Sequence, residues 1–153
     1  MIVFGKHVRD YLYFARHFLI ATMLVGTLRL LLSLAGVPTN IVNLFSINIV
    51  GLAAMIAFAI RVHTTGFGGY RQLLILIALE ILSGELVIAT GILLTAVTGI
   101  SNIFSEPEFS NSMGHMAHAV SHLILGPTLF AVMAWVPASA ILFVTRRIAP
   151  RKA

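Results

Sequence analysis

Three histidines lie close together in the segment Gly114-His-Met-Ala-His-Ala-Val-Ser-His122. On a helix, the spacing of His115, His118 and His122 places them within one face. Imidazole is the commonest transition-metal ligand in proteins, and it also binds haem iron. Histidine with methionine suits copper, whereas histidine with carboxylate suits zinc or iron. The further candidate ligands nearby are Met113, Met116, Glu106 and Glu108. We expect these histidines to hydrogen-bond lipid headgroups, water or a partner; the alternative is a haem b or copper site built from His115, His118 and His122.

Three charged residues fall inside apolar stretches: Arg29, Glu80 and Glu85. A charge at the middle of a bilayer costs about 2.5–3.5 kcal/mol on the insertion scale, so such residues tend to be paired or functional. Arg29 and Glu85 lie at similar depths in their stretches, whereas Glu80 points roughly 140° away from Glu85 on a helix. We expect an Arg29–Glu85 ion pair, with Glu80 hydrogen-bonded to a neighbour or protonated. The alternatives are a proton or cation relay and a contact with a partner subunit.

Four apolar stretches have the length of about 20 residues that a helix needs to cross a membrane. They are Phe18–Gly36, Ile41–Ile60, Leu73–Ile100 and Leu123–Val144. No alternating barrel pattern is present, and lipid demands a backbone whose hydrogen bonds are satisfied internally. The sequence therefore predicts one all-α domain, a bundle of four transmembrane helices. Pro127 and Pro137 each remove a hydrogen bond from the fourth helix and should kink it.

The basic residues predict the orientation of this bundle. Nine lysines and arginines lie outside the apolar stretches, and all nine fall before the first stretch, between the second and third, or after the fourth. By the positive-inside rule both termini are cytoplasmic. The net charge of +5 then reflects topology anchors and lipid contacts rather than a nucleic-acid surface. We expect an energy-transducing or plasma membrane, with a bacterial or archaeal inner membrane as the first choice.

The first 17 residues are too polar for a signal peptide. Apolar residues share one helical face there and polar residues occupy the rest, which predicts a short amphipathic helix lying on the membrane surface. The alternative is a helix continuous with the first span.

Two further histidines, His17 and His63, flank the first and second apolar stretches at the side that holds both termini. They are weaker haem candidates than the segment of three. In its size, four spans and histidine content, the chain resembles the small four-helix membrane cytochromes b, which bind haem through histidines on several spans. The chain departs from these proteins because its second, third and fourth stretches hold no histidine in their deep interior.

The composition excludes an ordinary soluble domain, since 59% of the residues are hydrophobic and only 10% are charged. Cysteine is absent, which excludes disulfides and thiolate sites. No catalytic motif is present, so the leading hypothesis is a non-catalytic accessory subunit of a larger membrane complex. The alternatives are a haem b or copper redox protein, and a proton-linked transporter or channel that uses the intramembrane glutamates. Because four helices are few for a transporter, the last hypothesis requires a self-oligomer.

Overall fold

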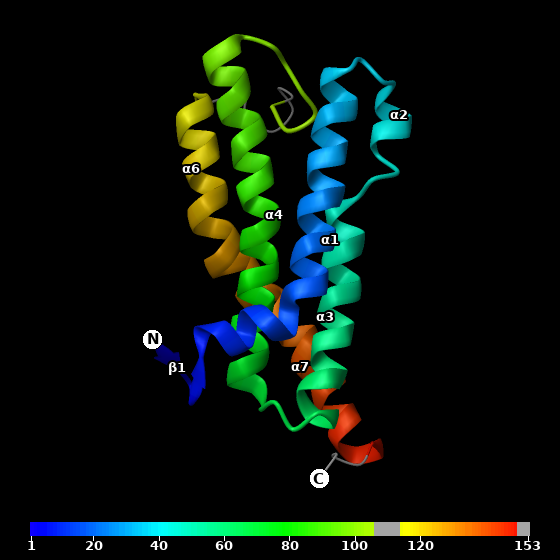
Figure 1. Ribbon diagram of the computed structural model, residues 1–153, viewed down its shortest axis with the longest axis vertical. Helices are drawn as coiled ribbons and strands as arrows, with labels where there is room; N and C mark the ends of the chain where they lie inside the picture. Colours follow the sequence, from blue (N-terminus) through cyan, green and yellow to red (C-terminus); the bar gives the residue numbers. More distant parts are fainter. Residues whose placement is uncertain (106–113, 150–153) are drawn as a thin grey trace.

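A computed structural model describes residues 1–105 and 114–149 of the chain. Within them, four helical segments are long and apolar enough to cross a membrane, by length and composition (Figure 1). They are Val8–Leu34, Thr39–Thr64, Tyr70–Thr98 and His115–Ile148. The predicted all-α membrane bundle is confirmed at this level. Each segment begins before its predicted start, and the second and fourth also end later, because polar turns continue the helices beyond their apolar centres; the first and third end two residues earlier than predicted.

The chain begins with a small hairpin rather than with a separate surface helix. Strand β1 (Ile2–Val3) pairs antiparallel with β2 (Lys6–His7). The turn residues Phe4 and Gly5 both have positive φ, 45° and 81°, as a tight two-residue hairpin turn requires. Helix α1 (Val8–Leu34) follows directly, with the Asp10 carboxylate accepting a hydrogen bond from the His7 backbone N–H at 2.9 Å. The described structure thus follows the alternative prediction, a helix continuous with the first span.

The second span is interrupted. The short helix α2 (Thr39–Val42) is followed by irregular residues and then by α3 (Ile47–Thr64). Asn43 ends α2 and Ser46 precedes α3, both residue types that favour helix ends over helix interiors. The polar side chains of Asn43 and Ser46 therefore lie where the second span is interrupted.

Helix α4 (Tyr70–Thr98) is the centre of the bundle and packs against α1, α3, the helix α6 (His115–Leu125) and α7 (Ala131–Ile148). Small residues on α4 allow this close approach. A Cβ at Gly84 would lie 3.0 Å from an Ile47 methyl, and one at Gly91 would lie 2.7 Å from the Phe104 ring. Gly84 and Gly91 therefore face the bundle interior.

The last span is one long helix with a defect in its middle. Between α6 and α7, residues Gly126–Phe130 form a π-helical turn, η1, that contains Pro127. Proline supplies no backbone N–H, so the regular hydrogen-bond ladder cannot continue through it. The Thr128 hydroxyl donates instead to the Ile124 carbonyl at 2.5 Å. Figure 1 shows the helix axis changing direction at this point, as the prolines predicted.

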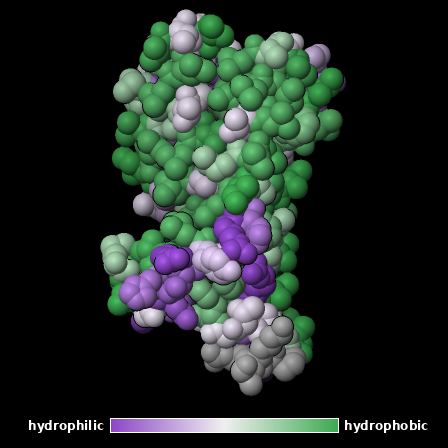
Figure 2. Space-filling view, in the orientation of Figure 1, coloured by the Kyte–Doolittle hydropathy of each residue, from purple (hydrophilic) through white to green (hydrophobic). Residues whose placement is uncertain are grey.

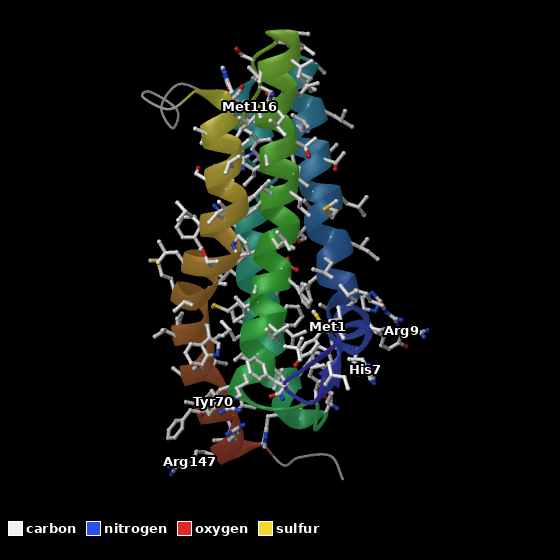
Figure 3. The ribbon with its side chains drawn as sticks, turned by 90° about the vertical axis from the view of Figure 1, so that its left-hand side faces the viewer. Met1, His7, Arg9, Tyr70, Met116 and Arg147 are labelled. Atoms are coloured by element: carbon white, nitrogen blue, oxygen red, sulfur yellow. The ribbon has the colours of Figure 1, made fainter. Side chains whose placement is uncertain are left out.

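The two ends of the molecule differ in polarity. The β1–β2 hairpin and the end of α7 both lie toward the lower end of Figure 1, and Figure 2 shows hydrophilic residues gathered there beneath an apolar upper body. Figure 3 places Arg9, Tyr70 and Arg147 at this end and Met116 at the other. Several arginines lie over aromatic rings here, for example Arg61 at 4.7 Å from the Phe14 centroid. We call this the basic end and the other the opposite end.

Candidate intramembrane site

A cavity of about 610 Å³ lies inside the bundle. It separates two clusters of buried apolar residues, one around Phe58 toward the basic end and one around Ile92 toward the opposite end. Most of its wall is apolar. Its polar lining consists of Thr22, Arg29, Asn48, Glu80, Glu85, His118 and His122. All three charged residues predicted inside the spans, and two of the three predicted histidines, therefore line one space.

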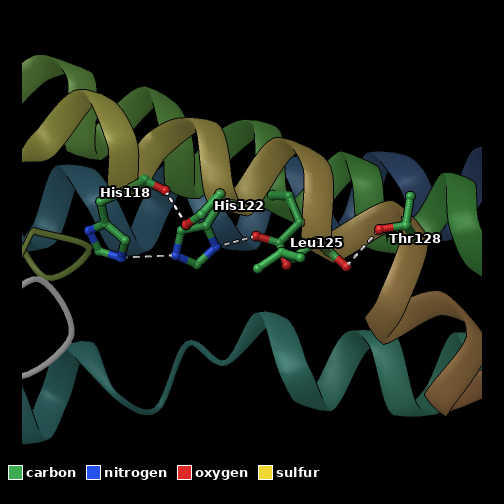
Figure 4. A network of polar contacts seen from close by, with 6 residues as sticks. His118, His122, Leu125 and Thr128 are labelled. Atoms are coloured by element: carbon green, nitrogen blue, oxygen red, sulfur yellow. Dashed lines mark hydrogen bonds and ion pairs between the residues drawn. The ribbon is translucent and has the colours of Figure 1, made fainter. Parts of the chain in front are cut away.

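Glu85 and two histidines form a continuous chain of polar contacts along this wall (Figure 4). The Glu85 carboxylate lies 2.5 Å from Nδ1 of His122. The Nε2 atom of His122 lies 3.2 Å from Nε2 of His118. His118 is only 4% exposed, and its Nδ1 atom is buried without a hydrogen-bond partner in the described part of the chain. The chain thus runs from a carboxylate beside the middle of the last span toward the opposite end.

The π-helical turn places the last span against Glu85. A Cβ on Gly126 would lie 2.3 Å from Cγ of Glu85, so no other residue fits there without displacing the glutamate. His122 is one helical turn before Gly126, on the same side of α6. The glycine therefore lets the carboxylate lie directly beside the helix that carries its imidazole partner.

Glu80 faces a different neighbour. Its Oε1 atom accepts a hydrogen bond from the Thr22 hydroxyl of α1. The residue is 3% exposed, and its Oε2 atom has no hydrogen-bond partner among the described residues. Five residues separate Glu80 from Glu85, so on one helix they point to different elements: Glu80 to α1 and Glu85 to α6.

The Glu85 carboxylate pairs with His122, where the sequence predicted an ion pair with Arg29. The Arg29 guanidinium donates to Oδ1 of Asn43 at 2.8 Å and lies 5.6 Å from the Phe104 ring centroid. The physical reason is rotation of α4. The side of α4 that faces α1 is formed by Glu80 and the small residues, whereas the Glu85 side chain points toward α6.

The remaining predicted residues lie apart from the cavity. His115 does not line it, and the predicted ligands Glu106, Glu108 and Met113 fall outside the described residues. His17 is exposed and contacts the Arg16 side chain, while Nε2 of His63 lies 3.1 Å from the Ala149 carbonyl. Residues 1–105 and 114–149 contain no group of three or more His, Asp or Glu side chains placed so that together they could hold one metal ion.

Sequence reasoning missed Thr22 and Asn48 as site residues. Thr22 is a small polar residue in an apolar stretch, and its role depends on which face α4 turns toward α1. Asn48 lies in the first turn of α3, where a polar residue has an ordinary structural explanation. Neither residue carries a signal that spacing alone would reveal.

Comparison with known protein families, with curated proteins and with solved structures gives no match to this chain. Function is accordingly inferred from the chemistry of the site.

Proposed function

We propose that this chain is a proton-linked membrane transporter that works as an oligomer and holds its transported ligand in the intramembrane cavity. The observation that carries the proposal is the Glu85–His122–His118 chain in the wall of that cavity. Ionisable residues inside a membrane bundle are costly and are typical of ion and proton pathways. A largely apolar cavity with a few convergent polar groups is typical of a small-ligand site.

The chain has the connectivity that proton transfer needs. With Nδ1 of His122 donating to Glu85, Nε2 of the neutral His122 ring is an acceptor, and Nε2 of His118 then donates to it. Nδ1 of His118, which has no hydrogen-bond partner among the described residues, accepts an incoming proton. One proton then moves along each hydrogen bond. The incoming proton stays on Nδ1 of His118, and Glu85 receives the proton from Nδ1 of His122, so that Glu85 is protonated beside the cavity. The reverse sequence returns the proton.

The direction of this path follows from the proposed topology. We infer that the basic end is cytoplasmic, since the positively charged residues gather there. His118 lies on the opposite side of Glu85 from that end, so the chain runs from Glu85 toward the end that we infer to be the outer one. This arrangement fits a protein of an energy-transducing or plasma membrane.

Proton flux in liposomes tests the proposal. Protein reconstituted with a pH-sensitive dye in the lumen should acidify the lumen faster than empty liposomes when a potassium gradient and valinomycin impose a negative interior potential. Glu85→Gln and His118→Gln should each reduce the protein-dependent rate by about tenfold or more, in line with the loss of a positioned proton-transfer group. His115→Ala is the matched control, because His115 is outside the cavity lining.

Circular dichroism and gel filtration establish that each variant is folded. Unchanged flux in folded Glu85→Gln and His118→Gln, or flux no faster than that of empty liposomes, would refute proton transport by this chain of residues.

A second candidate function, copper binding, is favoured by the distance between the Nε2 atoms of His118 and His122. Two nitrogens held by one metal at about 2.0–2.1 Å each in tetrahedral geometry lie roughly 3.3 Å apart. The two Nε2 atoms of His118 and His122 are 3.2 Å apart, and a carboxylate on the far nitrogen of a metal-bound histidine is a common outer-shell partner. The candidate ranks second because the described residues supply only these two nitrogens. Metal analysis of protein purified without chelators tests it: about one copper per chain, lost in His118→Gln, would support the site.

Haem b between His118 and His122 is disfavoured by the same geometry. Axial ligands lie on opposite sides of the porphyrin, whereas these two nitrogens contact each other on one helix face. The accessory-subunit hypothesis stays a prediction, and co-purification with fixed partners after mild solubilisation tests it.

A further inference from the structure

Glu80 is a buried carboxylate that takes no part in the proposed proton transfer through His118, His122 and Glu85. Its Oε1 is held by Thr22, while Oε2 has no partner in the part of the chain that the structure describes, although the residue is only 3% exposed. Glu80 also lines the cavity. A buried carboxylate is stable there only when it is neutralised, either by its own proton or by a cation from outside the protein.

Among the described residues that line the cavity, Glu80 is the carboxylate that can bind a cation, because the other charged or titratable groups are paired or distant. From α6 the titratable residues are His118 and His122, and His122 is already paired with Glu85 of α4. From α1 the charged residue is Arg29, seven residues beyond Thr22 and so about 10 Å along the helix from the Glu80 contact. Helices α3 and α7 contribute only uncharged residues to the lining.

The residues that line the cavity near Glu80 indicate which kind of cation would bind there. Phe58, Met55 and Ile77 line the cavity at this level, and Phe130 lines it from the last span. One carboxylate and one hydroxyl are too few oxygens for magnesium or calcium, which require about six or more. Apolar and aromatic walls instead favour a cation whose charge is spread over hydrocarbon, because an aromatic face attracts such a charge once water is removed.

The route into the cavity also suits an apolar ligand. Leu52 and Phe130 line the cavity, are 56% and 44% exposed, and lie in helical segments long and apolar enough to cross a membrane. The cavity therefore reaches the lipid-facing side of the bundle, where amphipathic cations concentrate. Its volume of about 610 Å³ falls within the usual size range of small-ligand sites.

We propose that Glu80 binds a lipophilic organic cation in this cavity and that binding displaces one proton. The protonated carboxyl plus the cation give the carboxylate–cation pair plus one proton, which leaves to solution; no bond other than the O–H bond is broken. The inference rests on the proposed function, since it names the ligand class of the transporter.

Binding of tetraphenylphosphonium to the purified full-length protein in detergent tests the inference. Equilibrium dialysis measures the dissociation constant at several pH values, and a pH indicator in weakly buffered solution measures released protons. Tetraphenylborate is the probe of the same shape and opposite charge. The variants are Glu80→Gln and Glu80→Asp, with Asp10→Asn as a control that removes a carboxylate at the basic end.

We expect saturable binding with about one proton released per cation, and affinity that falls about tenfold per pH unit on the acid side of the Glu80 titration, as competition for one carboxylate requires. Glu80→Gln should weaken binding at least about tenfold and remove the pH dependence. Glu80→Asp should keep pH-dependent binding, and Asp10→Asn should match the wild type.

Three results would overturn the inference: equal binding to folded Glu80→Gln, pH-independent binding by the wild type, or Glu80-dependent binding of tetraphenylborate in place of the cation. The wild-type pH series decides the question even if Glu80→Gln does not fold. Glu85-dependent proton flux without cation binding would refute only this inference. Glu80-dependent cation binding without flux would refute the transporter and leave the binding site standing.

Discussion

Two glutamates on one helix have different surroundings in this protein, and their separation by five residues explains the difference. Glu85 lies against Gly126 and contacts His122, whereas Glu80 contacts Thr22 and keeps one oxygen without a described partner. We assign proton transfer to the first and ligand binding to the second. At the residue scale, the contact that holds Glu80 in position is the Thr22 hydroxyl.

Replacement of Thr22 by valine should therefore destabilise the protein. The change keeps the side-chain shape and removes the hydroxyl donor to Glu80, and buried hydrogen bonds between membrane helices contribute about 0.6–1.7 kcal/mol. We expect a loss of this size in the free energy of unfolding, measured by circular dichroism during titration with a denaturing detergent. Thr90→Val is the matched control, because Thr90 is exposed and its hydroxyl donates only to the Leu86 carbonyl of its own helix. Equal losses in the two variants would contradict the assigned role of Thr22.

At the scale of the elements, the π-helical turn Gly126–Phe130 has the largest consequence for the site. It redirects the last span so that α6 lies along the upper part of α4 while α7 packs against α3 and α4. The same turn brings the Gly126 backbone to the Glu85 side chain. π-helical turns are frequent at functional sites, and here the turn forms part of the cavity wall.

Substitution of Gly126 by alanine tests this packing. The added methyl would lie 2.3 Å from Cγ of Glu85, so the glutamate or the helix must move, which typically costs about 1–3 kcal/mol in a packed interior. We expect a lower melting temperature and a reduced proton flux. Gly51→Ala is the comparison, because Gly51 is also a helical glycine but a Cβ there meets nothing within 4 Å. That variant should be neutral or stabilised by up to about 1 kcal/mol. An unperturbed Gly126→Ala variant would show that Glu85 is not confined as the structure describes.

The surface of the whole molecule has an apolar part, which suits contact with lipid, and a polar part at the basic end, which suits contact with water. Large apolar side chains such as Ile20, Leu24 and Ile49 are more than half exposed on the bundle, which is expected for a surface that faces lipid. Arginines gather at the basic end and lie over aromatic rings, for example Arg146 at 4.6 Å from the Tyr70 centroid. Amphipathic side chains of this kind anchor a bundle at the membrane boundary.

Single-cysteine labelling tests the proposed orientation, because the natural chain contains no cysteine. Thr65→Cys lies between α3 and α4 at the basic end, and Ser101→Cys follows α4 at the opposite end; both positions are exposed. In intact cells, a membrane-impermeant maleimide should label Ser101→Cys fully and Thr65→Cys only after permeabilisation. The reverse pattern would place both termini outside the cell and reverse the proposed direction of proton entry.

The number of spans and the polar residues inside them follow from the sequence alone, and the distribution of basic residues predicts that both termini share one side. Runs of apolar residues specify transmembrane helices because lipid leaves the backbone no other partner, and Arg29, Glu80, Glu85, His118 and His122 were all visible as polar residues at or inside such runs. The helical continuation of the first span was available only as an alternative, since hydrophobic periodicity near an interface fits both a surface helix and a spanning one.

Tertiary structure decided which of these residues meet. The Arg29–Glu85 pairing was inferred from equal depth, but depth does not specify rotation, and the rotation of α4 directs Glu85 to His122 instead. The fourth span was predicted to begin at Leu123, whereas the last helix begins at His115 and carries His118 and His122 along the bundle. Residue spacing fixes a position along and around its own helix. The rotation of each helix relative to its neighbours depends on small contacts, such as those at Gly84 and Gly126, that only the packed bundle specifies.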